Sequence, residues 1–202
     1  MINPMVPAVV LAAGKSTRMG RTKALLPLGD ADTFLTRIVS AFRAAGVEDV
    51  VVVLGHDAEA IASALADRKV AARIVINSNY ERGQFSSLLA GLQVVDRPGV
   101  AGMLLTLVDV PLVSPETIRA VVARHRATAA PIVRPVSGTR HGHPVLIDRR
   151  LFDAVRQADP GEGAKPVIRA HASAAGDVEV NDEGAFLDVD TPEEYAALTR
   201  AE

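Results

Sequence analysis

The chain has 202 residues and a formal net charge of −2, with 49% hydrophobic and 23% charged residues. This balance is typical of a globular protein and excludes a globally disordered chain. No long basic run is present, so a nucleic-acid or anionic membrane surface is not indicated, and the absence of cysteine excludes disulfides, thiolate metal sites and cysteine nucleophiles.

The first residues, 1–7, lack the basic stretch and apolar run of a signal peptide, and no apolar run is long enough to cross a bilayer. We therefore expect a cytoplasmic protein that does not enter the membrane. The length fits a single domain, which we place over residues 1–202.

Short apolar runs alternate with helical patterns along the chain. Strands are expected at 6–13, 50–54, 73–76, 102–108, 132–134, 144–147, 177–180 and 186–188. Helices are expected at about 33–45, 57–66, 86–95, 114–126, 151–157, 163–170 and from 191 onward, with residues 137–142 as a mobile loop. The alternation predicts a three-layer α/β fold with a mostly parallel sheet and helices on both faces.

A loop rich in glycine and basic residues follows the first strand. Residues 11–23 read Leu-Ala-Ala-Gly-Lys-Ser-Thr-Arg-Met-Gly-Arg-Thr-Lys. Small residues let the backbone approach a ligand closely, Arg18 can grip a phosphate through its planar fork, and Lys23 can act as a point charge. A P-loop is excluded because Val9 stands where its first glycine would be, and no Gly-x-Gly-x-x-Gly occurs here. The segment therefore predicts a different kind of phosphate-binding loop.

Carboxylates follow two other predicted strands. Asp109 directly follows the run 102–108, and Asp188 and Asp190 lie two positions apart near the end of the chain. Ligands bind beyond the carboxyl ends of strands in such sheets, so we expect these residues to meet the basic loop at one edge. Mg²⁺ takes one or two carboxylates plus phosphate oxygens, which fits this set. The alternatives are a turn aspartate for Asp109 and a helix cap for Asp190.

The pattern Leu-Ala-Ala-Gly-x-Ser-x-Arg-Met-Gly-x-x-Lys at 11–23 resembles the signature of the MobA-like NTP transferases, most of all the molybdenum cofactor cytidylyltransferase branch, and the likeness covers essentially the whole chain. It implies a Rossmann-like nucleotide-diphospho-sugar transferase fold. It also implies that the loop wraps the triphosphate of an NTP, that Arg18, Lys23 and Asp109 serve catalysis, and that Asp109 and Asp190 hold Mg²⁺, with Asp188 as the substitute for Asp190. The nucleotide-binding residues in the loop are then Leu11, Ala12, Ala13, Gly14, Arg18 and Lys23.

The resemblance assigns two further segments. In that family the stretch 79–87 lies against the nucleobase, which implies nucleotide contacts by Asn79, Ser86 and Ser87, although hydroxyls at a helix start ordinarily cap it. The Gly-His-Pro segment implies that His143 faces the acceptor substrate. A solvated loop is the alternative, and a metal site is disfavoured because no third ligand lies nearby, so the role of His141 stays open. The other histidines, at 56, 125 and 171, are expected at the surface.

The activity that the resemblance implies is transfer of CMP from CTP to the phosphate of a molybdopterin-type cofactor, with release of pyrophosphate and with a molybdoenzyme as a possible recipient. The guanylyl branch tends to carry Leu-Ala-Gly-Gly, so the methyl group of Ala13 favours CTP over another NTP. Three alternatives stay open: guanylyl transfer, transfer to a sugar or alcohol phosphate, and a non-catalytic partner in molybdoenzyme maturation.

Overall fold

Apolar runs form the centre of a mixed sheet in the computed structural model, which describes residues 5–200. The sheet has eight strands, seven of them in the order β10-β7-β9-β6-β1-β4-β5, with β8 paired to β7. Their bounds are β1 (Ala8–Ala12), β4 (Val50–Leu54), β5 (Arg73–Ile76), β6 (Gly102–Leu107), β7 (Ile132–Ser137), β8 (Arg140–His141), β9 (Val145–Asp148) and β10 (Asp177–Glu179). A separate two-stranded hairpin joins β2 (Pro27–Leu28) and β3 (Asp32–Thr33).

The four strands at the centre and one edge, β6, β1, β4 and β5, are parallel to one another, and only β9 and β8 run against their neighbours. The strands β1 and β4 are buried along their whole length, as their uninterrupted apolar runs predict. Parallel strands end at the same edge, so the loops after β1, β4 and β6 lie together. The expectation of a mostly parallel sheet is confirmed.

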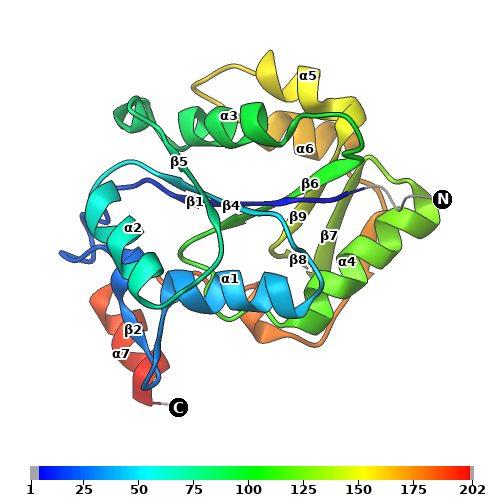
Figure 1. Cartoon of the computed structure of the whole chain (residues 1–202). Helices are drawn as coiled ribbons and strands as arrows, with labels where there is room; N and C mark the ends of the chain where they lie inside the picture. The colour runs from blue at the N-terminus through cyan, green and yellow to red at the C-terminus, as the bar shows by residue number, and fades with distance from the viewer. Residues whose placement is uncertain (1–4, 201–202) are drawn as a thin grey trace.

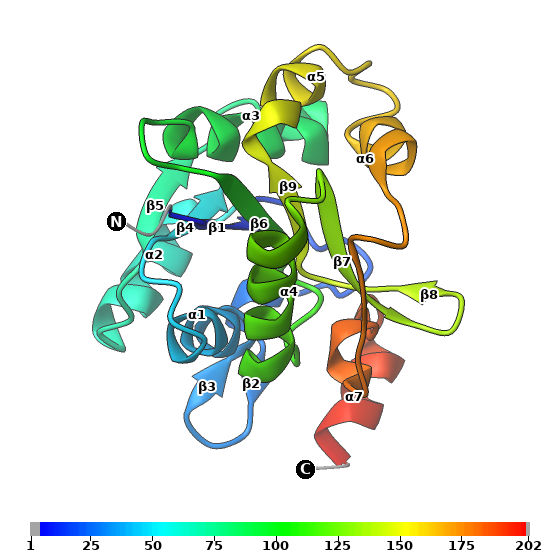
Figure 2. The same ribbon diagram turned by 90° about the vertical axis from the view of Figure 1, so that its right-hand side faces the viewer.

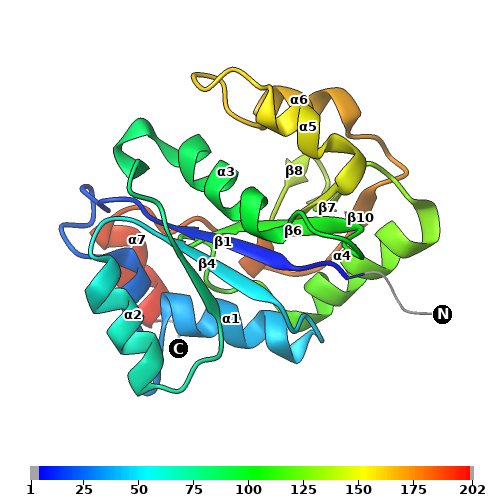
Figure 3. The same ribbon diagram turned by 45° about the horizontal axis from the view of Figure 1, so that its top comes forward.

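Helices cover both faces of the sheet (Figure 1). One face carries α1 (Phe34–Ala44), α2 (Ala58–Asp67) and α4 (Pro115–Thr128). The other face carries α3 (Gln84–Val95), α5 (Phe152–Arg156) and α6 (Lys165–His171). Figure 3 shows these two layers, with α7 (Pro192–Arg200) near the carboxyl ends of the central strands. Short 3₁₀ turns occur at Lys23–Leu25 (η1), Tyr80–Arg82 (η2), Arg149–Leu151 (η3) and Glu183–Ala185 (η4).

The helices α4 and α2 differ in whether a side chain caps the N-terminus. Ser114 caps α4, because its hydroxyl accepts a hydrogen bond from the backbone N–H of Thr117 at 3.2 Å. Asp57 precedes α2 but does not cap it with its side chain, since its backbone is left-handed, at φ 52°, and its carboxylate accepts from the hydroxyl of Thr22. The side chain of Asp57 therefore does not stabilise the start of α2, and its carboxylate instead links α2 to the basic loop.

Three expectations need correction. Residues 186–188 form no strand, because the chain leaves η4 and the N–H of Val189 bonds to the loop after β6 instead of to a sheet partner. The stretch 137–142 is a hairpin in which Arg140 of β8 pairs with Glu183, and Figure 2 shows it extending from the sheet. His125 is buried rather than exposed, with Nε2 2.8 Å from a carboxylate oxygen of Asp148.

Within residues 5–200, none of the helices combines the length and the apolar character that a membrane crossing requires.

Candidate functional site

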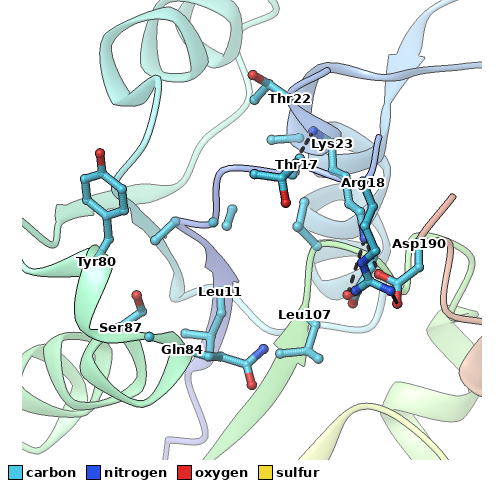
Figure 4. Close-up of a pocket in the computed structure, with 18 residues that line it drawn as sticks. Leu11, Thr17, Arg18, Thr22, Lys23, Tyr80, Gln84, Ser87, Leu107 and Asp190 are labelled. Carbon is cyan, nitrogen blue, oxygen red and sulfur yellow. Dashed lines mark hydrogen bonds and ion pairs between the residues drawn. The ribbon is translucent and has the colours of Figure 1, made fainter. Parts of the chain in front are cut away.

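A cavity of about 290 Å³ opens where β1 and β6 end. Figure 4 shows Tyr80 and Ser87 on one side of the opening and Lys23, Arg18 and Asp190 on the other. Its walls come from four separate parts of the chain: Leu11, Ala12, Ala13, Gly14, Ser16, Thr17, Arg18, Thr22, Lys23 and Ala24, then Tyr80, Gly83, Gln84 and Ser87, then Leu107, Val108 and Asp109, and finally Asp190. The expected convergence at one sheet edge is therefore present.

The basic loop has a defined shape. Ser16 is left-handed at φ 51° and Gly20 at φ 63°, and the N–H of Met19 donates to the carbonyl oxygen of Ser16 at 3.0 Å, so the chain turns tightly before η1. The hydroxyl of Ser16 accepts a hydrogen bond from the backbone N–H of Lys23 at 3.2 Å. This bond ties the end of the loop back to its start and fixes the position from which the Lys23 side chain extends.

A small apolar cluster holds the loop against the C-terminal acidic segment. Its buried members are Met19, Leu26, Leu28, Phe34 and Val189. The N–H of Val189 also donates to the carbonyl oxygen of Asp109 at 2.8 Å. Burial of Met19 and Val189 in one cluster thus places the carboxylates on either side of Val189 near the basic loop, although the two segments are far apart in sequence.

Lys23 lies between two carboxylates. Its Nζ is 2.5 Å from Oδ1 of Asp190 and 3.7 Å from Oδ2 of Asp109, and its side chain is only 9% exposed. The other oxygen of Asp190 contacts the guanidinium of Arg18 at 2.9 Å. Four of the predicted site residues therefore form one charged group at the cavity.

The two carboxylates differ in environment. Burial raises the pKa of Asp109, against the opposing influence of Lys23, and the negative charges of Asp188 and Asp190 raise it further. The hydrogen bond from Lys23 lowers the pKa of Asp190, aided by Arg18. Oδ1 of Asp109 is buried and finds no hydrogen-bond partner between residues 5 and 200. Such an orphaned oxygen is costly in a folded protein and is expected where a ligand supplies the missing partner.

The structure separates the candidates for the second carboxylate. Asp190 lines the cavity, whereas Asp188 is exposed and lies outside its lining. Asp190 does not cap α7, because the hydroxyl of Thr191 accepts from the N–H of Glu194 at 3.2 Å. Its side chain is thus left for the charged group.

A divalent cation would have few protein ligands here. No cluster of three or more potential metal-binding side chains occurs in the described part of the chain. Two carboxylates, one with a free buried oxygen, nevertheless fit Mg²⁺, which keeps several waters and takes substrate phosphate oxygens as further ligands. The donor set is all oxygen, which is the type that this ion prefers.

The three residues predicted to contact the nucleotide from the segment 77–87 differ in their position relative to the cavity. Ser87 lines the cavity, while Ser86 and Asn79 do not. The hydroxyl of Ser86 instead donates to the carbonyl oxygen of Gly83 at 2.8 Å, a local contact in the first turn of α3 that does not cap the helix. Asn79 immediately precedes η2, and its N–H donates to the side-chain oxygen of Asn77 at 3.0 Å.

Asn77 was missed by the sequence analysis and organises this segment. It is buried, and its amide nitrogen donates to the hydroxyls of Ser86 at 2.9 Å and Ser87 at 3.0 Å. A single asparagine after β5 carries no motif. The only sequence signal was its position at the carboxyl end of a predicted strand.

Tyr80 and Gln84 also line the cavity without having been predicted. A Cβ added to Gly55 would lie 2.5 Å from the Cβ of Tyr80, so the glycine after β4 is required for Tyr80 to sit where it does. Gln84 opens α3 and contributes to the wall beside Leu11 and Leu107 (Figure 4). Both residues lie in the stretch 79–87 that the resemblance places against the nucleobase, although neither was named there as a contact.

A second cavity of about 430 Å³ adjoins the first and shares Leu11, Gln84 and Leu107 with it. His143 lines this second cavity, with Nδ1 3.3 Å from the carbonyl oxygen of Leu105. A carbonyl oxygen only accepts, so Nδ1 carries the proton in this contact. Burial lowers the pKa of His143, which favours the neutral imidazole and leaves Nε2 as an acceptor.

The walls of the second cavity combine apolar and charged groups. Phe85, Leu88, Leu105, Val145 and Ile168 supply apolar surface, and the remaining side chains include Arg134, His141, Glu162, Lys165 and Arg169. Arg134 is held by Asp177 at 2.9 Å. The cavity therefore suits a ligand with a flat or apolar body and polar, anionic edges.

Comparison with known proteins supports this geometry. The profile of the MobA-like NTP transferase domain matches residues 8–175. The chain is 33% identical to nicotine blue oxidoreductase of Paenarthrobacter nicotinovorans, over 96% of this chain and 97% of that protein, and 30% identical to the purine catabolism protein PucB of Bacillus subtilis, over 100% and 99%. The crystal structure of Rv0371c from Mycobacterium tuberculosis is similar with a TM-score of 0.76 and 30% identity, covering 97% of this chain and 98% of that one, and Rv0371c has also been solved as a complex with manganese.

Proposed function

Because the chain belongs to the MobA-like NTP transferase family, we propose that it is a Mg²⁺-dependent enzyme that transfers CMP from CTP to the phosphate of a molybdopterin-type cofactor. The observation that carries this proposal is the charged group at the first cavity, where Arg18, Lys23, Asp109 and Asp190 meet. Two cations for a polyphosphate and two carboxylates for a divalent cation are what nucleotidyl transfer needs.

The glycines of the first cavity support a nucleotide as its occupant. A Cβ added at Gly14 would meet no protein atom within 4 Å, and the backbone of Gly14 does not have a positive φ. Neither crowding nor backbone strain therefore explains the glycine. A ligand that approaches the backbone closely does explain it, as expected where N–H groups face phosphate oxygens.

The positions of the side chains suggest an orientation for the nucleotide. Lys23 and Arg18 on one side of the opening would take the phosphates, while Tyr80 and Ser87 on the other side would contact the nucleoside (Figure 4). An aromatic ring offers a face on which a base can stack, and a hydroxyl can pair with the edge of the base. We keep CTP as the preferred NTP on the resemblance of the loop at Ala13.

The second cavity would hold the acceptor. It shares Leu11, Gln84 and Leu107 with the first, so a molecule bound there can extend a phosphate toward the nucleotide. His143, with Nε2 as an acceptor, and the charged side chains along this cavity would pair with the polar edges of a pterin.

The reaction needs positioning and charge neutralisation more than a strong base. An oxygen of the acceptor phosphate, already ionised, attacks the α-phosphorus of CTP, the bond from that phosphorus to the bridging oxygen breaks, and pyrophosphate leaves with the electron pair. Lys23 and Arg18 stabilise the charge on the departing pyrophosphate. Asp109 and Asp190 would hold Mg²⁺, which supplies further neutralisation of the phosphate oxygens when bound. The manganese complex of Rv0371c supports a divalent ion in this family.

Pyrophosphate release tests the proposal. The purified protein is incubated with Mg²⁺ and each of the four NTPs, with purified molybdopterin or with a sugar phosphate as acceptor. We expect release with CTP and molybdopterin, and none after treatment with EDTA. Release with GTP alone would indicate the guanylyl activity, release with the sugar phosphate would replace the acceptor, and tight molybdopterin binding without turnover would indicate a maturation partner.

A redox assay belongs to the same experiment, because one relative is named an oxidoreductase. Nicotine blue with a nicotinamide reductant is added in place of the NTP and acceptor. We expect no reductant consumption above the rate without protein. Consumption without any pyrophosphate release in the first assay would overturn nucleotidyl transfer.

A further inference from the structure

The charges at the first cavity cancel one another in the protein alone. Both oxygens of Asp190 are engaged, one by Lys23 at 2.5 Å and the other by Arg18 at 2.9 Å. Lys23 also faces Asp109 at 3.7 Å. Two carboxylates are thus matched by two cations, and the group as a whole offers little net attraction to a further cation.

Lys23 is held in this position by the fold. Its side chain is 9% exposed, and its backbone N–H is fixed by Ser16 at the start of η1. By contrast, the side chain of Arg18 is 68% exposed and reaches Asp190 from the loop. Lys23 is therefore the more persistent of the two partners, since the exposed ion pair is screened by solvent.

The same side chains have two incompatible tasks. If Lys23 and Arg18 bind the triphosphate, they give up part of their contact with Asp190. If Asp190 binds a divalent cation, its oxygens are no longer shared with an ammonium and a guanidinium. Both changes are favourable together, because phosphate oxygens attract the basic side chains and release the carboxylate at the same moment.

We propose that Lys23, assisted by Arg18, serves as an internal counter-cation that occupies the metal carboxylates until a nucleotide draws it away, so that the divalent cation and the NTP bind cooperatively. This inference rests on the proposed function for the identity of the nucleotide. Its central claim, competition between Lys23 and a divalent cation for Asp109 and Asp190, concerns the nucleotide-free protein alone.

Mn²⁺ binding measures this competition directly, because free Mn²⁺ is counted by electron paramagnetic resonance in the absence of any turnover. Wild type is expected to bind Mn²⁺ at least ten times more tightly with CTP than without it. In Lys23→Met, which keeps the length of the side chain and removes the charge, nucleotide-free Mn²⁺ binding is expected to tighten at least tenfold, equivalent to about 1.4 kcal/mol. The effect of CTP on Mn²⁺ affinity should fall correspondingly.

Two more variants provide a second test of the competition and a control for net charge. Arg18→Gln, at an exposed position, keeps the fold intact and is expected to tighten nucleotide-free Mn²⁺ binding by a smaller factor, about threefold, because Arg18 is the more screened partner. Arg21→Gln removes an exposed cation of the same loop and should leave Mn²⁺ binding unchanged, which controls for net charge. Circular dichroism of each variant verifies that it is folded.

Unchanged or weaker Mn²⁺ binding by Lys23→Met and by Arg18→Gln, without nucleotide, would overturn the inference. That result would mean that the basic side chains support the carboxylates rather than compete for them. Failure of the proposed function has a different signature: CTP would not alter Mn²⁺ binding in wild type and no pyrophosphate would form, while the nucleotide-free comparison of Lys23→Met with wild type would still decide the competition.

Discussion

The backbone N–H of Val189 donates a hydrogen bond to the carbonyl oxygen of Asp109 at 2.8 Å, and this contact joins the two acidic segments of the site. It orients the C-terminal segment so that Asp190 lines the cavity while Asp188 stays exposed. The two aspartates are two positions apart, yet only Asp190 forms ion pairs with Arg18 and Lys23. Their separate replacement by asparagine therefore tests which one serves the site.

We expect Asp190→Asn to lower kcat/KM for pyrophosphate release at least about tenfold, the scale at which disturbed metal coordination lowers activity. Asp190 touches both Lys23 and Arg18, so its loss also removes the group that orders them. Asp188→Asn is the matched control and should change kcat/KM by less than about threefold, since its side chain is exposed and lies outside the cavity lining, and its charge is screened by solvent. A larger loss for Asp188→Asn than for Asp190→Asn would reverse the assignment.

Asp109→Asn tests the first carboxylate. The variant removes the charge at a residue whose Oδ1 is buried without a partner among the described residues. We expect NTP binding to persist while kcat falls by about 10² or more, because the lost group acts on charge that develops during transfer. Equilibrium binding of CTP and the rate of pyrophosphate release are measured on the same preparation. Near-normal kcat with Mg²⁺ would show that Asp109 is not a metal ligand.

The elements nearest the site could be predicted because the residue pattern of each segment alone indicates its secondary structure. Val50–Leu54 is apolar without interruption, which indicates a strand buried on both faces, and the fold buries all five residues. A phosphate-binding role of the basic loop could be predicted in the same way, because its glycines and basic residues directly follow such a strand. The local sequence was sufficient for prediction wherever the residues of one segment alone determine its structure.

Other features depend on contacts between distant segments and could not be predicted. His125 is buried where the antiparallel strand β9 brings Asp148 against α4. Asn77 is a single polar residue whose importance comes from two hydroxyls in the next helix. Residues 186–188 have the composition of a strand, yet the N–H of the adjoining Val189 donates its hydrogen bond to the loop after β6. In each case the deciding partner lies elsewhere in the chain.

Asn77→Ala tests the segment that faces the nucleoside. Asn77 holds the hydroxyls of Ser86 and Ser87 and accepts from the N–H of Asn79, so its removal leaves buried polar groups unpaired. We expect a loss of about 1–3 kcal/mol in the free energy of unfolding and a rise in KM for the NTP. Urea unfolding and steady-state kinetics measure the two effects.

Two serine variants separate the structural part of this effect from the nucleotide contact. Ser87→Ala alters a buried residue that lines the cavity and should raise KM for the NTP, with a loss of about 1 kcal/mol in the free energy of unfolding from its bond to Asn77. Ser86→Ala removes a hydroxyl that bonds to Gly83 and should lower stability while KM changes little. The opposite pattern would mean that Ser86, as the resemblance implied, is the nucleotide contact.

The buried pair of His125 and Asp148 predicts how stability depends on pH. Nε2 of His125 lies 2.8 Å from one carboxylate oxygen of Asp148, and Nε of Arg150 lies 2.8 Å from the other. Burial by itself would raise the pKa of Asp148, but the hydrogen bonds from Arg150 and His125 outweigh it, and the pKa lies below the ordinary value of 3.8. The folded state therefore binds a proton at Asp148 less readily than the unfolded state does.

A carboxylate with a lowered pKa stabilises the fold above its unfolded-state pKa, and that stabilisation is lost as the pH falls from 3.8 toward the lower folded-state value. We expect Asp148→Asn to lower the free energy of unfolding by about 1–3 kcal/mol relative to wild type at pH 7, because hydrogen bonds to a charged group are lost. The difference should shrink below pH 3.8, where wild type loses the same contribution. Asp67→Asn, at an exposed position, is the control and should follow wild type throughout. Urea unfolding at a series of pH values measures the difference, and a gap between wild type and Asp148→Asn that widens in acid would contradict the prediction.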